Sequence, residues 1–167
     1  SGAAFKGVQI GGPSGGCLIL DQLDAPLDFD SVKKLDAIMG SGGLVVMDEN
    51  TCMVEVARFF MNFTQRESCG KCVPCREGTK RMLEILERIV DGKGEMSDLD
   101  ELEELAHMVQ SMALCGLGKS APLPVISTLN RFRDEYVEHI RDKKCHAKVC
   151  TALRQFHINS EFCIGCG

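Results

Sequence analysis

Four cysteines constrain what this chain can fold into more than any other feature of it. Cys69, Cys72 and Cys75 form a Cys-x-x-Cys-x-x-Cys run inside ESCGKCVPCREG, and Cys115 follows in MALCGLGKSAP. Three thiolates at this spacing can bind one face of a cubane iron–sulfur cluster, and a distant fourth can complete it. The sequence therefore predicts a 4Fe–4S cluster held by these four residues.

Zinc binding and disulfide formation are the two alternatives that stay open for the cysteines at this point. Four cysteines can also bind zinc, although zinc usually takes two separated Cys-x-x-Cys pairs. Ten cysteines in 167 residues would also fit a disulfide-stabilised extracellular domain. The long amphipathic segments and the closely spaced cysteine pairs favour a metal protein of a reducing compartment over such a domain.

Composition excludes some classes of protein. Hydrophobic residues make up 44% of the chain, enough for a buried core, and the net charge is −5. A nucleic-acid-binding domain would carry a basic surface, so no nucleic-acid partner is expected. No apolar run is long enough to insert directly into a membrane. The first residues lack a signal-peptide pattern, and we expect a cytoplasmic protein.

Short strands and one short helix are expected before residue 50. Alternation and apolar runs predict strands at 4–10, 17–20 and 44–47. Asp30 is the expected cap of a helix over 31–39. The glycine run GGPSGG is interpreted as a turn, because no Gly-x-Gly-x-x-Gly follows a strand and opens a helix there.

A four-helix bundle is expected over residues 51–141, so the fold class is mainly α. Apolar residues recur at helical spacing in four segments, at 51–64, 79–90, 97–109 and 125–140. Gly70 and Pro74 are expected to keep the cysteine segment irregular. Ser97 is the expected cap of the third helix, and 115–122 is expected to be a loop.

The helix order predicts how Cys115 reaches the other three cysteines. An antiparallel pair of helices returns the chain to the end of the bundle from which it started. Three basic residues would then lie near an anionic cluster and favour its reduced form. These are Lys71, Arg76 and Lys119.

The motifs resemble a known family. ESCGKCVPCREG, preceded by GGPSGG and GSGGLVVMD, is similar to the NADH- and FMN-binding subunit of complex I-like enzymes, the NuoF family. The segment CGLGKSAPLPVISTLNRFRDEYVEHI resembles more closely the beta subunit of NAD-linked, electron-bifurcating iron hydrogenases. The resemblance covers nearly the whole chain.

The resemblance implies three regions. Residues 1–48 would be the remnant of a β-grasp domain of the SLBB type, with a linker. Residues 51–141 would be the 4Fe–4S domain, with Cys69, Cys72, Cys75 and Cys115 matching the cluster ligands. Residues 142–167 would be a cysteine-rich tail that begins a ferredoxin-like module.

The resemblance also implies electron transfer. In the intact subunit, FMN would take electrons from NADH and pass them to the cluster, with Gly116 and Leu117 near the flavin. The glycine-rich FMN and NADH loops are absent from this sequence, so the chain alone is not expected to be catalytically complete. The implied partners are other subunits of an NADH dehydrogenase or hydrogenase, namely a 2Fe–2S thioredoxin-like subunit and a larger iron–sulfur subunit.

A second metal site is expected among the other cysteines. As the resemblance is interpreted, Cys52 and the tail both belong to the hydrogenase type, and a Cys-x4-Cys pair lies within zinc spacing. The hypothesis is zinc bound by Cys52, Cys145, Cys150 and Cys163. Alternatives for the fourth ligand are Cys166, His146 and His157, and the alternative to a metal site is a set of free thiols.

Three further residues are expected to play no part in a metal site. His107 and His139 lie in predicted helices, where histidines are more often surface residues than ligands. Cys17 is expected to be a small buried hydrophobic residue.

Overall fold

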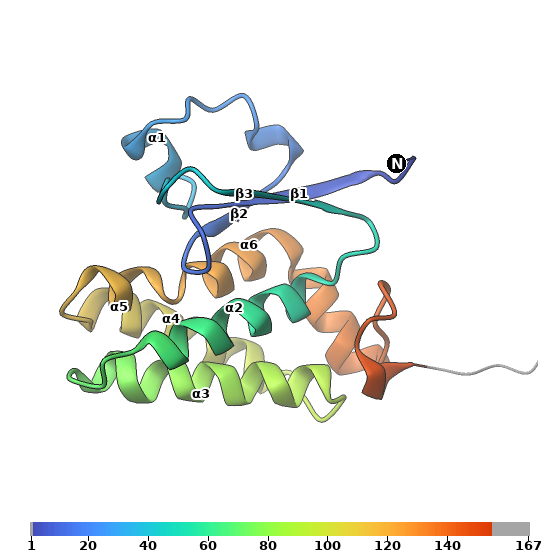
Figure 1. The fold of residues 1–167 in the computed structure, drawn as a ribbon. Coiled ribbons are helices and arrows are strands. Elements are labelled where there is room, and N and C mark those ends of the chain that lie inside the picture. Colours follow the sequence, from blue (N-terminus) through green and yellow to red (C-terminus); the bar gives the residue numbers. More distant parts are fainter. Residues whose placement is uncertain (1, 155–167) are drawn as a thin grey trace, which may run out of the picture.

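The computed structural model describes residues 2–154, which form a helical bundle with a small sheet along one side (Figure 1). The bundle helices are α2 (Met53–Glu67), α3 (Val73–Val90), α4 (Ser97–Met112) and α6 (Leu123–Val137). Both α2 and α4 contact α3 and α6, so the four helices close around one core. The mainly helical prediction is therefore confirmed. Within the described part of the chain, no helix has the length and apolar character needed to cross a membrane.

The apolar stripes predicted from periodicity are the faces that the helices bury. On α3, Met82, Ile85, Leu86 and Ile89 are fully buried, and the stripe repeats every three to four residues. On α4 the stripe of Leu99, Leu102, Ala106 and Val109 faces them. Removal of this apolar surface from water is the main force that holds the bundle together.

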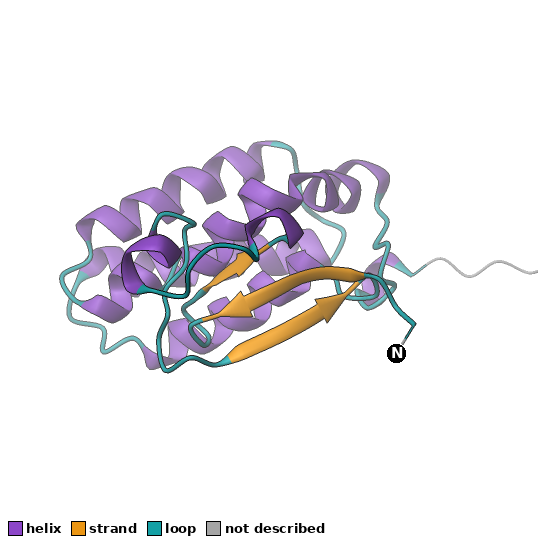
Figure 2. Cartoon of the chain, turned by 90° about the horizontal axis from the view of Figure 1, so that it is seen from above, coloured by secondary structure: helices purple, strands orange, loops and turns teal. Residues whose placement is uncertain are grey.

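The sheet covers the side of the bundle formed by α2 and α6 (Figures 1 and 2). Its strands are β1 (Phe5–Ile10), β2 (Gly16–Leu18) and β3 (Leu44–Asp48), antiparallel and in the order β2-β1-β3. Between β2 and β3 the chain forms a 3-10 turn, η1 (Leu20–Gln22), and a short helix, α1 (Phe29–Lys33). The β-grasp assignment of this unit stays a prediction, since three antiparallel strands are common to many folds.

The glycine run is a turn, as predicted. It connects β1 to β2, with Ile10 paired to Gly16 across the hairpin. Gly11 has a φ of +90°, a conformation that glycine adopts without steric cost. A Cβ atom at Gly11 would also clash with the Ile38 carbonyl oxygen.

Several local boundaries differ from the prediction. Pro74 does not keep the cysteine segment irregular; it lies in the first turn of α3, where a missing N–H costs nothing. The segment after Cys115 contains a short helix, α5 (Gly116–Ser120), where a loop was expected. Asp28, and not Asp30, caps the first helix by accepting the Ser31 N–H at 2.8 Å. At α4 the capping position is Met96 instead of Ser97.

An ion pair joins the two helices of the α3–α4 hairpin. Asp98 accepts hydrogen bonds from the Arg88 guanidinium, one of them from Nε at 3.1 Å, and from the Glu95 N–H at 2.8 Å. Its side chain is only 5% exposed. Burial acts to raise the pKa of Asp98, but the bonds from Arg88 and Glu95 outweigh it and lower the pKa below its ordinary value.

We predict that Asp98→Ala lowers the free energy of unfolding by about 1–3 kcal/mol, because it removes the charge-assisted hydrogen bonds that the buried Asp98 carboxylate accepts from Arg88 and from the Glu95 N–H. Since the folded pKa of Asp98 is lowered, its contribution is present above the ordinary carboxyl pKa of about 3.9 and is lost as the pH falls through the folded value. Denaturant titrations at neutral and acidic pH measure both effects. Asp100→Ala, at a side chain 85% exposed, is the control and should change stability by less than about 0.5 kcal/mol. Equal effects of the two substitutions would contradict the prediction.

Candidate metal centres

The three closely spaced cysteines lie where α2 ends and α3 begins. Cys69 follows the end of α2, Cys72 is the residue that precedes the first turn of α3, and Cys75 lies within that turn. Gly70, with a φ of +74°, turns the chain between the helices. Arg76 donates a hydrogen bond to the Gly70 carbonyl oxygen at 2.7 Å and so closes the loop on itself.

The fourth cysteine reaches the same end of the bundle. Cys115 lies between α4 and α5, and the backbone N–H of the preceding Leu114 lowers the pKa of Cys72. A Cβ atom at Gly118, in α5, would lie 3.5 Å from the Cys75 sulfur. The antiparallel return of α4 thus brings the two cysteine segments together, as the helix order predicted.

The sulfur atoms of this first group share one electrostatic environment. The bond from the Leu114 N–H is the largest of the effects that lower the pKa of Cys72. The pKa of Cys75 is raised mainly by burial, and the negative charges of Cys72, Cys115 and Cys69 raise it further. The Ser68 hydroxyl lies 3.4 Å from the Cys75 sulfur and has the opposite effect.

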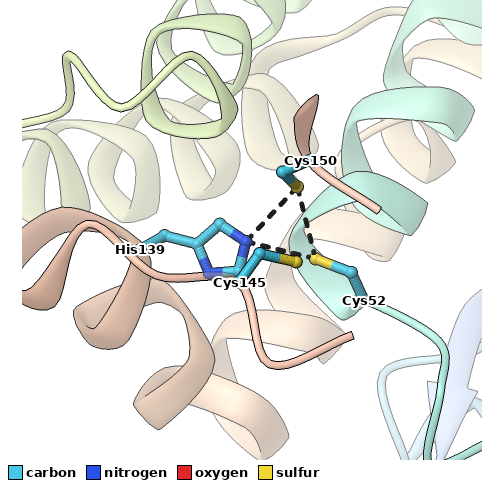
Figure 3. Close-up of side chains that lie close together, drawn as sticks. All are labelled: Cys52, His139, Cys145 and Cys150. Carbon is cyan, nitrogen blue, oxygen red and sulfur yellow. Dashed lines mark hydrogen bonds between the residues drawn. The ribbon is translucent and has the colours of Figure 1, made fainter. Parts of the chain in front are cut away.

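A second group lies at the other end of α2 (Figure 3). Its four possible ligand atoms all lie within 4.8 Å of one another, and no other set of three or more His, Cys, Asp or Glu side chains in residues 2–154 is gathered closely enough to hold a single metal ion. All four members are buried: Cys52, His139, Cys145 and Cys150. The sulfur atoms of Cys52 and Cys150 are 3.8 Å apart. The His139 Nε2 atom lies 3.3 Å from the first and 3.4 Å from the second.

Each member of this second group is positioned by a local feature of the backbone. Cys52 is the N-cap of α2, and its sulfur accepts the Glu55 N–H at 3.5 Å. His139 lies in a π-helical turn, η2 (Glu138–Asp142), that directly follows α6. Such turns often occur at functional sites because the widened turn shifts side chains out of regular α-helical register. Cys145 and Cys150 flank a short loop in which the Lys148 N–H donates to the Cys145 carbonyl oxygen at 3.0 Å.

The charges in this group are strongly coupled. The Cys150 thiol and the His139 imidazole are hydrogen-bonded to Cys52 and lower its pKa to about 4. Burial acts to lower the pKa of His139, but the hydrogen bond and the charge of Cys52 raise it to about 9. The same neighbouring thiolate raises the pKa of Cys150. A buried thiolate is thus stabilised by several close donors, which a divalent cation could replace.

The structure corrects one expectation for this group and leaves another untested. His139 was expected at the surface, which was wrong: it is 1% exposed and faces Cys52 and Cys150. His107 is exposed, as expected. His146 is exposed and is not part of the group. The predicted ligand Cys163 lies outside the described residues, as do Cys166 and His157. The nearness of His139 to the Cys145–Cys150 pair in sequence was the signal that could have identified it.

The fold and these two groups define a helical domain with two candidate metal-binding sites. Residues 55–139 match the model of the NADH-ubiquinone oxidoreductase-F iron-sulfur binding region, and the chain belongs to this family. All four cysteines of the first group lie inside the matched range. Of the second group only His139 does, at its last residue.

Relatives of this chain are subunits of two kinds of enzyme. It is 54% identical, over 99% of its length, to the NADP-reducing hydrogenase subunit HndC of Solidesulfovibrio fructosivorans. It is 42% identical, over 81% of its length, to an NADH-quinone oxidoreductase subunit of Streptomyces coelicolor. It covers 34% and 30% of these two proteins, so it spans about a third of their length. Among solved structures it resembles the NAD+-reducing NiFe hydrogenase, with a TM-score of 0.74 at 31% identity over 83% of this chain and 24% of that one.

We predict that thiol alkylation separates the cysteines by exposure. Cys69 and Cys115 are exposed, and they should react first with iodoacetamide in the reduced, metal-free protein. Cys17 is fully buried, and burial raises its pKa to about 12. It should react much more slowly than Cys69 and Cys115, because the thiolate is the nucleophile. Mass spectrometry of timed digests measures the order, and labelling of Cys17 as fast as Cys115 would contradict it.

Proposed function

We propose that this chain is the electron-transfer part of a larger NADH dehydrogenase or hydrogenase subunit. In this proposal Cys69, Cys72, Cys75 and Cys115 hold a 4Fe–4S cluster. The observation that carries it is the convergence of two cysteine segments on one end of the bundle, where Gly118, three residues after Cys115, packs against Cys75 closely enough that a Cβ atom there would lie 3.5 Å from the Cys75 sulfur. The match to the family of an iron–sulfur binding region supports it independently.

The ligand pattern of the first group supports a cluster over a single zinc ion, because zinc usually takes two separated Cys-x-x-Cys pairs. A tetrahedral zinc ion with Zn–S bonds of about 2.3 Å holds its sulfur ligands roughly 3.8 Å apart. In residues 2–154 the ligand atoms of the second group lie within 4.8 Å of one another, and no comparable gathering includes the cysteines of the first group. A cubane places iron and sulfide atoms between the thiolates, so it requires more widely spaced ligands. Cys69 and Cys115 are exposed, so the surface beside them has room for a cubane cluster.

The chain's own residues would set the properties of the site. The cluster would supply one-electron transfer. The Ser68 hydroxyl can donate a hydrogen bond to the Cys75 sulfur, and the Leu114 N–H stabilises negative charge on the Cys72 sulfur. Both effects stabilise the more negative, reduced form of the cluster and so raise its reduction potential. The first turn of α3, an 18-residue helix, contains Cys75, and the positive end of the helix dipole also favours negative charge.

The proposed electron donor and acceptors lie outside this chain. Gly116 and Leu117 would face FMN, which takes electrons from NADH in the intact subunit. A Cβ atom at Gly116 would meet nothing within 4 Å, so the surface beside Cys115 is open to an approaching group. The proposed partners are a 2Fe–2S thioredoxin-like subunit and a larger iron–sulfur subunit, in agreement with relatives that are named as hydrogenase and oxidoreductase subunits.

We predict that the anaerobically prepared chain is brown, bleaches with dithionite and contains about four iron and four sulfide per chain. Cys115→Ala should lose most of the iron and the electron paramagnetic resonance signal of the reduced cluster. Cys17→Ala is the matched control, since Cys17 is buried in β2 and packs in a different part of the core, and it should keep both. Full iron in Cys115→Ala would exclude the proposed ligand set. A colourless protein that binds only zinc would support the alternative of a structural module that joins subunits.

We further propose that the second group binds zinc. The 3.8 Å separation of the Cys52 and Cys150 sulfurs equals the spacing expected around tetrahedral zinc. Three cysteines and one histidine form a complete ligand set for a closed structural zinc site. In this proposal His139 takes the place of Cys163 as the fourth ligand. Zinc would connect the start of α2 to the loop that follows η2, and so stabilise the fold.

We predict that the protein retains about one zinc per chain at this site, and that His139→Gln and Cys150→Ser each lose it. His146→Gln is the matched histidine control, because His146 is exposed and outside the group. Elemental analysis after mild chelation measures the content. Unchanged zinc in both variants would exclude the site, and equal loss in His146→Gln would exclude His139 as the fourth ligand.

A further inference from the structure

An ion pair between the sheet and the bundle lies directly beside the second metal centre. Lys6 projects from β1 and Glu135 from α6, and the Lys6 Nζ atom lies 2.7 Å from a Glu135 carboxylate oxygen. Their side chains are only 14% and 17% exposed. Charged side chains at this degree of burial are stable only when paired, so each of the two restricts where the other can lie.

The pair holds the backbone on both sides of Cys52. The Lys6 ammonium donates to the carbonyl oxygen of Thr51, the residue before Cys52. The other carboxylate oxygen of Glu135 accepts the N–H of Met53, the residue after Cys52, at 3.0 Å. The ligand therefore lies in the middle of a segment fixed by one cation and one anion. Its sulfur position is set by these contacts as well as by the helix that follows.

Glu135 also orients the histidine of the group. Its main-chain carbonyl oxygen lies 2.7 Å from the His139 Nδ1 atom. A carbonyl oxygen can only accept, so Nδ1 carries a proton, and Nε2 is the ring nitrogen that faces Cys52 and Cys150 and would bind the metal. Metal-binding histidines typically have this arrangement, in which a bond to the other ring nitrogen fixes the tautomer and the ring orientation. Glu135 thus contacts the segments of two of the four ligands.

We propose that Lys6 and Glu135 are positioning residues that preorganise the second metal centre, a proposal that rests on the zinc site described above. Binding of the metal is thereby coupled to docking of β1 on the bundle, because Lys6 belongs to the sheet. Loss of a residue that orients metal ligands typically lowers metal affinity by about 10–100-fold. We expect a loss in this range for Lys6→Met and for Glu135→Gln. Lys6→Arg, which keeps the charge and the donor groups, should restore most of the affinity.

The matched control is another ion pair between the sheet unit and α6. Asp36 lies 3.8 Å from Arg131, and the hydrogen bonds of these two side chains in the described chain go to residues other than Cys52, His139, Cys145 and Cys150. Asp36 has a φ of +51°, which asparagine accepts readily. Asp36→Asn therefore removes an ion pair between the same two parts of the fold without a change of backbone conformation. It should leave zinc affinity within about twofold of the unmodified protein.

The experiment measures the zinc affinity of the cluster-loaded chain by competition with a chromophoric chelator. Zinc that Cys150→Ser still binds is taken as binding outside the second group and is subtracted. Cobalt(II) is then bound at saturation, and its thiolate charge-transfer band reports whether Cys52 still coordinates. A merely structural role would leave this band unchanged. A weaker band and a 10–100-fold lower zinc affinity in Lys6→Met and Glu135→Gln, with Asp36→Asn unaffected, are the expected results. Lys6→Met keeps the test decisive if Glu135→Gln fails to fold.

Two outcomes would overturn the proposal, and they differ from each other. If the unmodified chain binds no more zinc than Cys150→Ser, the second metal centre itself fails, and the positioning role fails with it. If the unmodified chain binds zinc but Lys6→Met and Glu135→Gln match Asp36→Asn in affinity and in the cobalt spectrum, the zinc site stands and the positioning role alone is excluded.

Discussion

The antiparallel packing of α3 on α4 is the constraint on which the rest of the structure depends. The two helices approach so closely at Gly78 that a Cβ atom there would clash with a Val109 methyl carbon. At the turn of the hairpin, the ion pair between Arg88 and Asp98 fixes the register of one helix against the other. Because α4 returns in this register, Gly118 of α5 packs against Cys75 and the fourth cysteine arrives beside the first three. A shift by one turn, about 5.4 Å, would separate the two cysteine segments.

The two candidate metal centres lie at opposite ends of α2, and their geometries suit different chemistry. The first lies beyond the C-terminal end of the helix and includes two exposed cysteines, Cys69 and Cys115, a placement suited to electron exchange with an outside group. The second, at the N-cap, is buried and tight. A 15-residue helix spans about 22 Å. The centres are therefore held apart by a rigid element, and a change at one end would reach the other only through this helix and its packing.

Local signals in the sequence predicted those parts of the fold that local physics decides. Helical periodicity identified the buried faces of α3 and α4, because a 3.6-residue repeat of apolar side chains can be satisfied by one packing surface. The glycine turn between β1 and β2 was predicted because glycine adopts the backbone conformations of a turn without steric cost, which is also a local property. Errors arose where a residue type permits two structures. Pro74 breaks a helix interior but is favoured in a first turn, and composition alone does not say in which position it lies.

The sequence by itself determined the family and the meeting of Cys69, Cys72 and Cys75, because closely spaced thiols on one short segment meet whatever the rest of the chain does. Cys115 joins them only through the antiparallel return of α4. Cys52, Cys145 and Cys150 were expected in one site from the resemblance, and only the tertiary structure decided the fourth member of the second group, His139. Cys52 and His139 are far apart in sequence, and they meet because α2 packs against α6 and a π-helical turn moves the imidazole inward. The sequence of a helix does not decide whether its histidine side chain lies at the surface or in the core, because that depends on where the neighbouring helix packs. Burial of that ring, and with it the complete ligand set, is a property of packing and not of any local motif.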